Sequence, residues 1–147
     1  MVDIRFVPVE DWHVAHVAEH MRTEDAKEVM AMGGYTPRAA LNHSLGHPGD
    51  AWTALFDGEP AAIFGVIPVS IIGGTAIAWL LGTDALVTHW RAFARRSRDV
   101  VAGLHTRYPV LANAAYIEST LSLRWLRWLG ARFDIHGKEA RFLLCAQ

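Results

Sequence analysis

The clearest metal-ligand spacing in the chain is His16-x-x-Glu19-His20, which matches the H-x-x-E-H pattern of some zinc enzymes. On a helix, the two imidazoles of this pattern lie one turn apart on the same face, with a carboxylate beside them. Such a zinc site needs a third protein ligand, and no further carboxylate has an evident place next to this helix. His13 simply extends a polar face. We therefore interpret the motif as an exposed helix and expect no metal site.

The arginine-rich part of the chain is a second candidate. Residues 88–132 contain eight arginines and two acidic residues, whereas residues 1–60 contain four Lys or Arg and ten Asp or Glu. Basic segments bind single-stranded nucleic acid when aromatic rings are exposed beside the charge. The neighbouring aromatic residues, such as Trp90 and Trp125, instead fall on apolar helical stripes. The pattern favours helix faces that attract each other or a sister subunit, with an anion or partner surface as the alternative, and it does not favour nucleic acid.

Length and composition predict a single domain over residues 1–147. The chain is 52% hydrophobic and 20% charged, which is sufficient for one sizeable core. Asp3 and Arg5 interrupt the first residues before an apolar region can form, so no signal peptide is predicted. Cys145 has no second cysteine with which to form an intramolecular disulfide, which favours a reducing compartment. We expect this cysteine to be buried in a strand.

Turn and cap residues delimit the elements that must position these side chains. Asp57-Gly58 predicts a hairpin, and Gly73-Gly74 predicts the next turn. A strand, a long helix and another strand form a crossover that pairs parallel strands. We expect an α/β (α+β) fold with a mixed, mostly antiparallel sheet and helices on both faces. The predicted strands are 4–9, 51–56, 61–69, 75–81, 110–117, 132–136 and 141–145, and the predicted helices are 10–21, 23–33, 37–46, 88–107 and 119–129.

Residues 61–83 form an uncharged run of 23 residues, which is long enough to span a membrane as a helix. Gly65, Pro68, Gly73 and Gly74 interrupt this run. These residues suit two strands joined by a Gly-Gly turn. We therefore expect two buried strands and no membrane segment.

Residues 119–133, STLSLRWLRWLGARF, are typical of a short helix that ends at a glycine and is followed by a strand. Ser119 or Thr120 can accept hydrogen bonds from the free N–H groups of the first turn, and Gly130 can adopt the left-handed conformation that ends a helix. The helix is apolar on almost every side. We expect it to be largely buried.

This ending and the order of the elements resemble the GNAT N-acetyltransferase superfamily, and the resemblance in element order covers nearly the whole chain. It implies a GNAT-like fold with acetyl-CoA or CoA as the possible cofactor. In that superfamily a tyrosine four residues before the glycine protonates the departing thiolate, and an asparagine lies eleven residues before it. These positions are Leu126 and Ser119 here. Because leucine cannot donate a proton, we assign no catalytic residue.

The resemblance also implies where an acyl-CoA would bind. In the superfamily, a Gln/Arg-x-x-Gly-x-Gly/Ala loop opens the long helix, and its backbone N–H groups hold the pyrophosphate. The matching stretch, residues 82–91, has no glycine after Gly82 and places Asp84 near the anion, although His89 and Arg91 offset that charge. Trp79 lies where the family's central strand lines the acyl channel, and we expect it to be a core residue. The implied cofactor-binding residues are Leu80, Leu81, Thr88, His89, Arg91 and Ser119.

Part of the chain is similar to one branch, the internal virion protein A family of T7-like phages. The similar segments lie within residues 79–133: a Trp-Leu strand, the basic helix around residues 93–96, RYPVL-x-N at 107–113, and the ending at 124–133. This resemblance implies a minor phage or prophage protein linked to virion assembly. It would be found in the host cytoplasm or in the virion, with phage structural proteins or a sister subunit as partners.

The sequence as a whole favours a GNAT-fold phage or prophage protein with a non-catalytic structural or assembly role and no required cofactor. The first alternative is an acetyl-CoA-dependent N-acyltransferase that binds its cofactor through the main chain of Leu80, Leu81 and Thr88. The second alternative is a small-ligand or peptide binding module that uses the cleft between the central strands.

Overall fold

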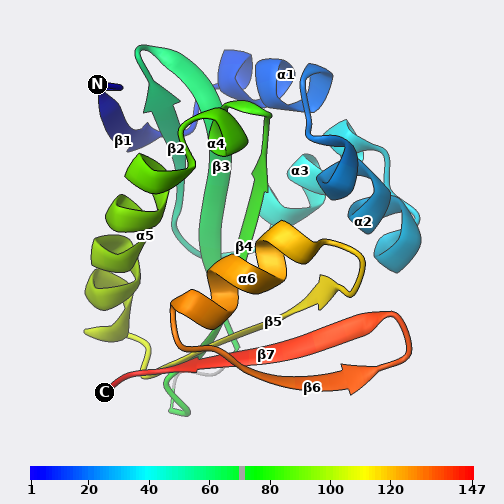
Figure 1. The fold of residues 1–147 in the computed structure, drawn as a ribbon, viewed down its shortest axis with the longest axis vertical. Coiled ribbons are helices and arrows are strands. Elements are labelled where there is room, and N and C mark those ends of the chain that lie inside the picture. The colour runs from blue at the N-terminus through cyan, green and yellow to red at the C-terminus, as the bar shows by residue number, and fades with distance from the viewer. Residues whose placement is uncertain (70–71) are drawn as a thin grey trace.

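The computed structural model describes residues 1–69 and 72–147, which contain seven strands and six helices (Figure 1). The strands are β1 (Ile4–Pro8), β2 (Ala51–Phe56), β3 (Glu59–Pro68), β4 (Thr75–Gly82), β5 (Val110–Tyr116), β6 (Arg132–His136) and β7 (Glu139–Cys145). The helices are α1 (Asp11–Glu19), α2 (Thr23–Gly33), α3 (Pro37–Leu45), α4 (Ala85–Thr88), α5 (Trp90–His105) and α6 (Thr120–Trp128). The predicted order of elements is confirmed, apart from the additional helix α4.

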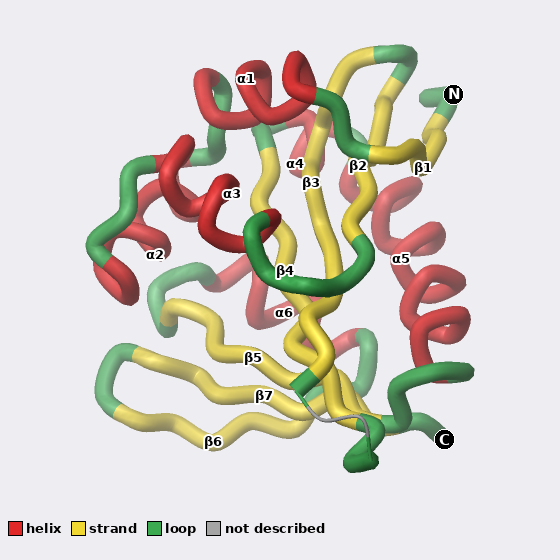
Figure 2. Tube along the Cα trace, turned by 180° about the vertical axis from the view of Figure 1, so that it is seen from behind, coloured by secondary structure: helices red, strands yellow, loops and turns green. Residues whose placement is uncertain are grey.

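All seven strands form one sheet in the order β1-β2-β3-β4-β5-β7-β6. Every neighbouring pair is antiparallel except β4 and β5, which the long helix connects as predicted. Helices α5 and α6 cover one face of the sheet, and α1 and α3 cover the other face over β2, β3 and β4 (Figures 1 and 2). The predicted mixed, mostly antiparallel sheet with helices on both faces is therefore confirmed.

The two strands expected within residues 61–83 are present as β3 and β4. Their connection includes Gly74, whose φ of +65° suits a residue without a side chain. None of the helices in the described ranges is long and apolar enough to cross a membrane.

The predicted helix over 88–107 is present as α5, and the additional short helix α4 precedes it. The N–H groups of Val87 and Thr88 bond to the Asp84 carbonyl oxygen, and this turn forms α4. The Thr88 hydroxyl donates to the same oxygen at 3.2 Å. His89 then leaves the helical conformation, with φ −112° and ψ 36°, before α5 begins. The break was missed because residues 84–88 contain no glycine or proline, which are the usual signals for one.

Helix α6 differs from its prediction in two respects. Gly130 ends it with φ +99°, as expected, but the Ser119 side chain makes no cap bond to the helix. The expectation of a largely buried helix was also wrong, because only Leu126 within it is fully buried and Trp128 is 44% exposed. The ring of Trp128 lies under the Arg98 guanidinium, 3.9 Å from it, which explains how an exposed indole is accommodated.

Cys145 is exposed, so the expectation that it is buried in a strand was also wrong. In β7, inward-facing and outward-facing residues alternate. Ala140, Phe142 and Leu144 are buried, and Cys145 falls on the opposite face.

Gly65 in β3 creates the space in which the Trp79 side chain of β4 lies. The two residues are directly paired in the sheet. A Cβ at position 65 would lie 3.0 Å from Trp79 Nε1 and 2.6 Å from the Asp50 carbonyl oxygen. That oxygen accepts a hydrogen bond from the Val66 N–H at 3.0 Å and cannot move away freely. A side chain at position 65 would therefore push against both the indole and the backbone.

We predict that Gly65→Ala lowers the free energy of unfolding by about 1–3 kcal/mol, because it overpacks a site with no free volume. The matched control is Gly103→Ala within α5, where nothing lies within 4 Å of the added Cβ. This variant should raise the free energy of unfolding by about 0.5–1 kcal/mol, since alanine is the better helix former. Urea denaturation measures both, and equal stability of Gly65→Ala and the unmodified chain would contradict the prediction.

Candidate functional site

Strands β4 and β5 pair over only three residues and then separate. The paired residues are Thr75 to Ile77 on β4 and Val110 to Ala112 on β5. At the next position, the Asn113 side chain donates from Nδ2 to the Ala78 carbonyl oxygen at 2.8 Å, and its Oδ1 accepts from the Ala114 N–H at 2.7 Å. The amide thus takes the place of the next ladder bonds and fixes the point at which the strands diverge.

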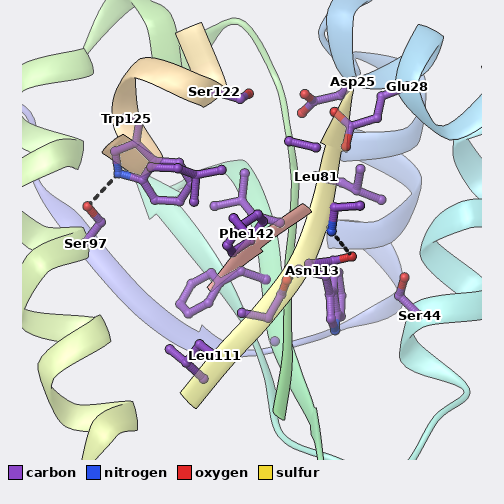
Figure 3. A pocket seen from close by; sticks show the side chains of 18 of the residues that line it. Asp25, Glu28, Ser44, Leu81, Ser97, Leu111, Asn113, Ser122, Trp125 and Phe142 are labelled. Atoms are coloured by element: carbon purple, nitrogen blue, oxygen red, sulfur yellow. Dashed lines mark hydrogen bonds between the residues drawn. The ribbon is translucent and has the colours of Figure 1, made fainter. Parts of the chain in front are cut away.

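A cavity of about 340 Å³ lies between the diverging strands (Figure 3). Its walls come from both sides of the sheet and are mostly apolar. On the side of α5 and α6 they include Phe93, Ser97, Val101, Ser122 and Trp125, and on the side of α2 and α3 they include Glu28, Met32, Tyr35, His43 and Trp79. A concave, mainly apolar site with a few polar groups is the usual form of a small-molecule site.

The backbone of Leu80 faces this cavity. Ala78 directs its carbonyl toward Asn113, and Gly82 directs its N–H toward Asp25 on α2. Because main-chain polar groups of a strand alternate in direction, the N–H and C=O of Leu80 point toward the same open edge. The main chain of Leu81 points toward β3 instead, and its side chain lines the cavity. An extended ligand can therefore bond to the strand edge at Leu80.

One carboxylate of α2 holds the end of β4. Asp25 Oδ2 accepts from the Gly82 N–H at 2.9 Å, and Asp25 Oδ1 pairs with Arg22 Nη1 at 3.1 Å. The backbone N–H of Arg22 also donates to the Gly82 carbonyl oxygen at 2.8 Å. Burial raises the pKa of Asp25 to about 6, although Arg22 and the Gly82 N–H oppose the shift. The N–H and C=O groups of Gly82 are thus satisfied by Asp25 on α2 and by Arg22 just before it.

A second carboxylate, one turn further along α2, holds the end of β5. Glu28 accepts hydrogen bonds from the Tyr116 backbone N–H and, at 3.5 Å, from the Ser119 hydroxyl. Burial, and next the neighbouring charge of Asp25, raise the pKa of Glu28 to about 7. A carboxyl group with a pKa near neutrality in a cavity is suited to accept a proton from a bound molecule.

Helix α6 supplies no acid to the cavity at the position where the sequence comparison sought one. Leu126 is 5% exposed and packs in the apolar cluster with Leu111, Phe142 and Leu144. Ser122 is the hydroxyl of α6 that lines the cavity. The Trp125 indole N–H donates to Ser97 Oγ at 3.0 Å, which ties α6 to α5.

The start of α5 forms a second hollow, of about 510 Å³. The first turn of a helix leaves N–H groups without helical partners, and His89 provides no side-chain cap to them. Thr88, His89 and Arg91 line this hollow together with Arg95. The combination of free N–H groups with arginines suits a phosphate. The end of β4 offers no such space, because a Cβ at Gly82 would lie 2.3 Å from Leu86 Cδ1.

The predicted site residues thus fall into three places. Leu80 and Leu81 line the cavity between β4 and β5 (the main cavity), and Thr88, His89 and Arg91 line the second hollow, at the start of α5. Ser119 is 2% exposed and bonds to Glu28. The His16-x-x-Glu19-His20 motif lies at the C-terminal end of α1, where the rings of His16 and His20 stack with their centroids 4.4 Å apart. No group of three or more potential metal ligands is found among the described residues.

Sequence reasoning missed Asp25 and Glu28. Both lie in the first half of a helix, where acidic residues are common because they offset the helix dipole. Their partners, Gly82 and Tyr116, are far away in the sequence, so no local pattern marked them.

No family model matches the chain, and no curated protein matches it. Solved structures do match. The GNAT domain of S. lividans PAT has a TM-score of 0.73 at 15% identity, covering 99% of this chain and 90% of that one. A GCN5-related N-acetyltransferase from Brucella melitensis has a TM-score of 0.68 at 16% identity, covering 97% and 75%. An acetyltransferase (GNAT family) from Bacillus anthracis has a TM-score of 0.68 at 12% identity, covering 99% and 96%.

These similarities show that the chain has the fold of GNAT acetyltransferases. Identities this low show the fold alone. The resemblance to the phage internal virion protein A family stays a prediction, since none of these comparisons supports it.

We predict that Glu28 makes the protein less stable as the pH rises. Because its pKa in the folded state, about 7, lies above the ordinary value of 4.5, the folded state binds more protons between these values. The free energy of unfolding therefore falls as the pH rises through this window. Glu28→Gln, which cannot ionise, should show a shallower fall in melting temperature between about pH 5 and about pH 8.

The matched control is Glu19→Gln at the exposed end of α1, which should follow the unmodified chain. Asp25 and Arg22 remain in all three proteins, and because the charge of Asp25 contributes to the raised pKa of Glu28, the difference between the profiles includes the coupling between the two carboxyl groups. A Glu28→Gln profile parallel to that of the unmodified chain would contradict the assignment.

Proposed function

We propose that the protein is an acyl-CoA-dependent N-acyltransferase. The observation that carries the proposal is the carboxyl group of Glu28, with a pKa of about 7, in a cavity between diverging strands. The GNAT fold supports the same reading. An amine is protonated at neutral pH and must lose a proton to become an amide, so a base of this strength is what the reaction needs.

The residues present fit an acyl-CoA in an extended form. The Leu80 main chain offers one donor and one acceptor at an open strand edge, which suits the amides of a pantetheine arm. The phosphates would bind at the start of α5, with Thr88, His89 and Arg91. When bound, acyl-CoA supplies an activated thioester. Because Leu86 occupies the space beside Gly82, the phosphates are expected at the first turn of α5 rather than at the end of β4.

Glu28 acts on the acceptor. Its carboxylate takes one proton from the ammonium group. The lone pair of the resulting amine then forms the new C–N bond while the C–S bond breaks, and the nitrogen gives up a second proton. The electrons of the C–S bond leave with sulfur, which takes up the second nitrogen proton through water. A thiol has a pKa of about 8.5, so a thiolate leaves without a strong acid beside it. Leucine at position 126 is therefore compatible with turnover, at a lower rate than a tyrosine would support.

The non-catalytic assembly role favoured by the sequence is the second candidate. Two observations favour it: the close packing of Leu86 on Gly82, and the burial of Leu126 in the core. Both features remove groups that an acetyltransferase of this fold commonly uses. In this alternative the chain retains the architecture, binds no cofactor and acts through phage structural proteins or a sister subunit.

Thermal melting with millimolar CoA or acetyl-CoA distinguishes the two roles. A ligand that binds only the folded state raises the melting temperature, by a free energy of RT ln(1 + [L]/Kd). We expect a clear rise, and Arg91→Glu should reduce it by weakening affinity about tenfold or more. Arg124→Glu on the exposed side of α6 should leave the rise unchanged. No rise with either ligand would overturn the enzyme proposal and favour the assembly role.

We also predict that Glu28→Gln lowers kcat/KM for amine acylation by about 10²–10⁴-fold, since it removes the base. In the unmodified protein, kcat/KM should increase with pH up to about 7 and then level off as Glu28 loses its proton. The variant should lose this dependence while keeping the rise in melting temperature with CoA. A variant with full activity would show that another group takes the proton.

A further inference from the structure

The main cavity passes through the sheet and has two different ends. Along β4, Ala78 and Leu80 pack with the residues under α5 and α6, whereas Trp79 and Leu81 pack with α1, α2 and α3. All four residues line the cavity. Since the free strand edge and the start of α5 would hold the acyl-CoA, the end between α2 and α3 is left for the acceptor.

The charge at the acceptor end is small and negative. Among the described residues that line the cavity, Asp25 and Glu28 are the acidic ones, and none is a lysine or arginine. Arg22 pairs with Asp25 and so neutralises it. Above about pH 7, where Glu28 is ionised, the balance is one negative charge, at Glu28. Such a site suits an acceptor with one ammonium group, and it offers no partner to an acceptor carboxylate.

The remaining surface of this end is mostly apolar and aromatic, with the Ser44 hydroxyl as a further polar group. It is formed by Met32, Tyr35, His43 and Trp79, with Val29 beside them. The Tyr35 ring stacks on His43 at 4.8 Å and lies against Gly33, where a Cβ would be 2.5 Å from the ring. These packed rings form a wall for a flat body. A cavity of about 340 Å³ that also holds the acyl end has room for one ring and a short linker.

We infer that the acceptor is a monoamine whose single positive charge is attached to an apolar, ring-sized body and which carries no carboxylate. This inference rests on the proposed N-acyltransferase function. The ammonium group lies against Glu28, and the ring lies among Trp79, Tyr35 and Met32. In the reaction, the ammonium group loses one proton to Glu28 and a second, through water, to the leaving thiolate. The amide C–N bond replaces the C–S bond of the thioester, and CoA is released as the thiol.

Phenethylamine and phenylalanine form a matched pair of probes, because they differ only in the carboxylate. Methylamine lacks the ring, and spermidine carries additional charges that have no partner here. Release of CoA thiol with each amine gives kcat/KM. We expect the value for phenethylamine to exceed those for phenylalanine, methylamine and spermidine by at least about tenfold each. Equal or higher values for phenylalanine or spermidine would overturn the inference and leave the acyltransferase function standing.

Two variants locate the body of the acceptor. Trp79→Ala should raise KM for phenethylamine by about tenfold while changing KM for methylamine little, since only the larger amine contacts the indole. Trp79→Phe keeps a ring and should retain most of the affinity, which controls for a folding defect in the alanine variant. Trp128→Ala, at an exposed tryptophan of α6, should leave both values unchanged. Equal effects of Trp79→Ala on both amines would overturn the placement.

Direct binding separates the inference from the catalytic proposal. Isothermal titration of the protein with phenethylamine, phenylalanine and 2-phenylethanol, in the absence of CoA, tests the ring and the charge without any turnover. We expect phenethylamine to bind at least about tenfold more tightly than the other two, and Glu28→Gln to remove this preference. Absence of that preference would overturn the inference. Absence of CoA binding, with the preference intact, would instead overturn the proposed function alone.

Discussion

The early separation of β4 and β5 is the constraint on which the remaining features of the site depend. Strands that stop pairing inside a protein leave main-chain donors and acceptors without partners, and such groups are costly when buried. Where the strands diverge, Asn113 satisfies the Ala78 carbonyl group. At the two strand ends, Asp25 satisfies the Gly82 N–H and Glu28 satisfies the Tyr116 N–H. The main chain of Leu80, between these points, faces the cavity.

Helix α2 holds this separation open. Its two carboxylates, Asp25 and Glu28, lie one turn apart. Asp25 binds the C-terminal end of β4 and Glu28 binds the C-terminal end of β5, so the helix sets the distance between the two ends. This arrangement places two acidic groups close together in a partly buried site, and burial raises the pKa of both. The group that stabilises the open strands is therefore also the one able to exchange a proton near neutral pH. Stability and the proposed catalysis share one residue, Glu28.

The sequence was sufficient for the fold because the fold is marked locally. Asp57-Gly58, Gly74 and Gly130 each require a backbone conformation that few residues adopt, and they separate the elements in order. The site is marked differently. Asn113 and Glu28 act through partners that only the folded chain brings near, and a buried glutamate looks the same in sequence as a solvated one. The break between α4 and α5 was hidden because residues 84–88 contain no glycine or proline to mark it.

The position of the chemistry follows from these contacts. In the superfamily that the sequence resembles, the helix at the position of α6 contributes a tyrosine and an asparagine, and this sequence has Leu126 and Ser119 in their place. Here Leu126 belongs to the core, and the Ser119 hydroxyl donates a hydrogen bond to Glu28 and does not cap the helix. Ser119, just before α6, thus bonds to Glu28, which α2 presents to the cavity. A thiolate leaves without a strong acid beside it, whereas an ammonium group must be deprotonated before its nitrogen can attack. A site that has the base Glu28 but no acid therefore retains the group that the reaction needs more.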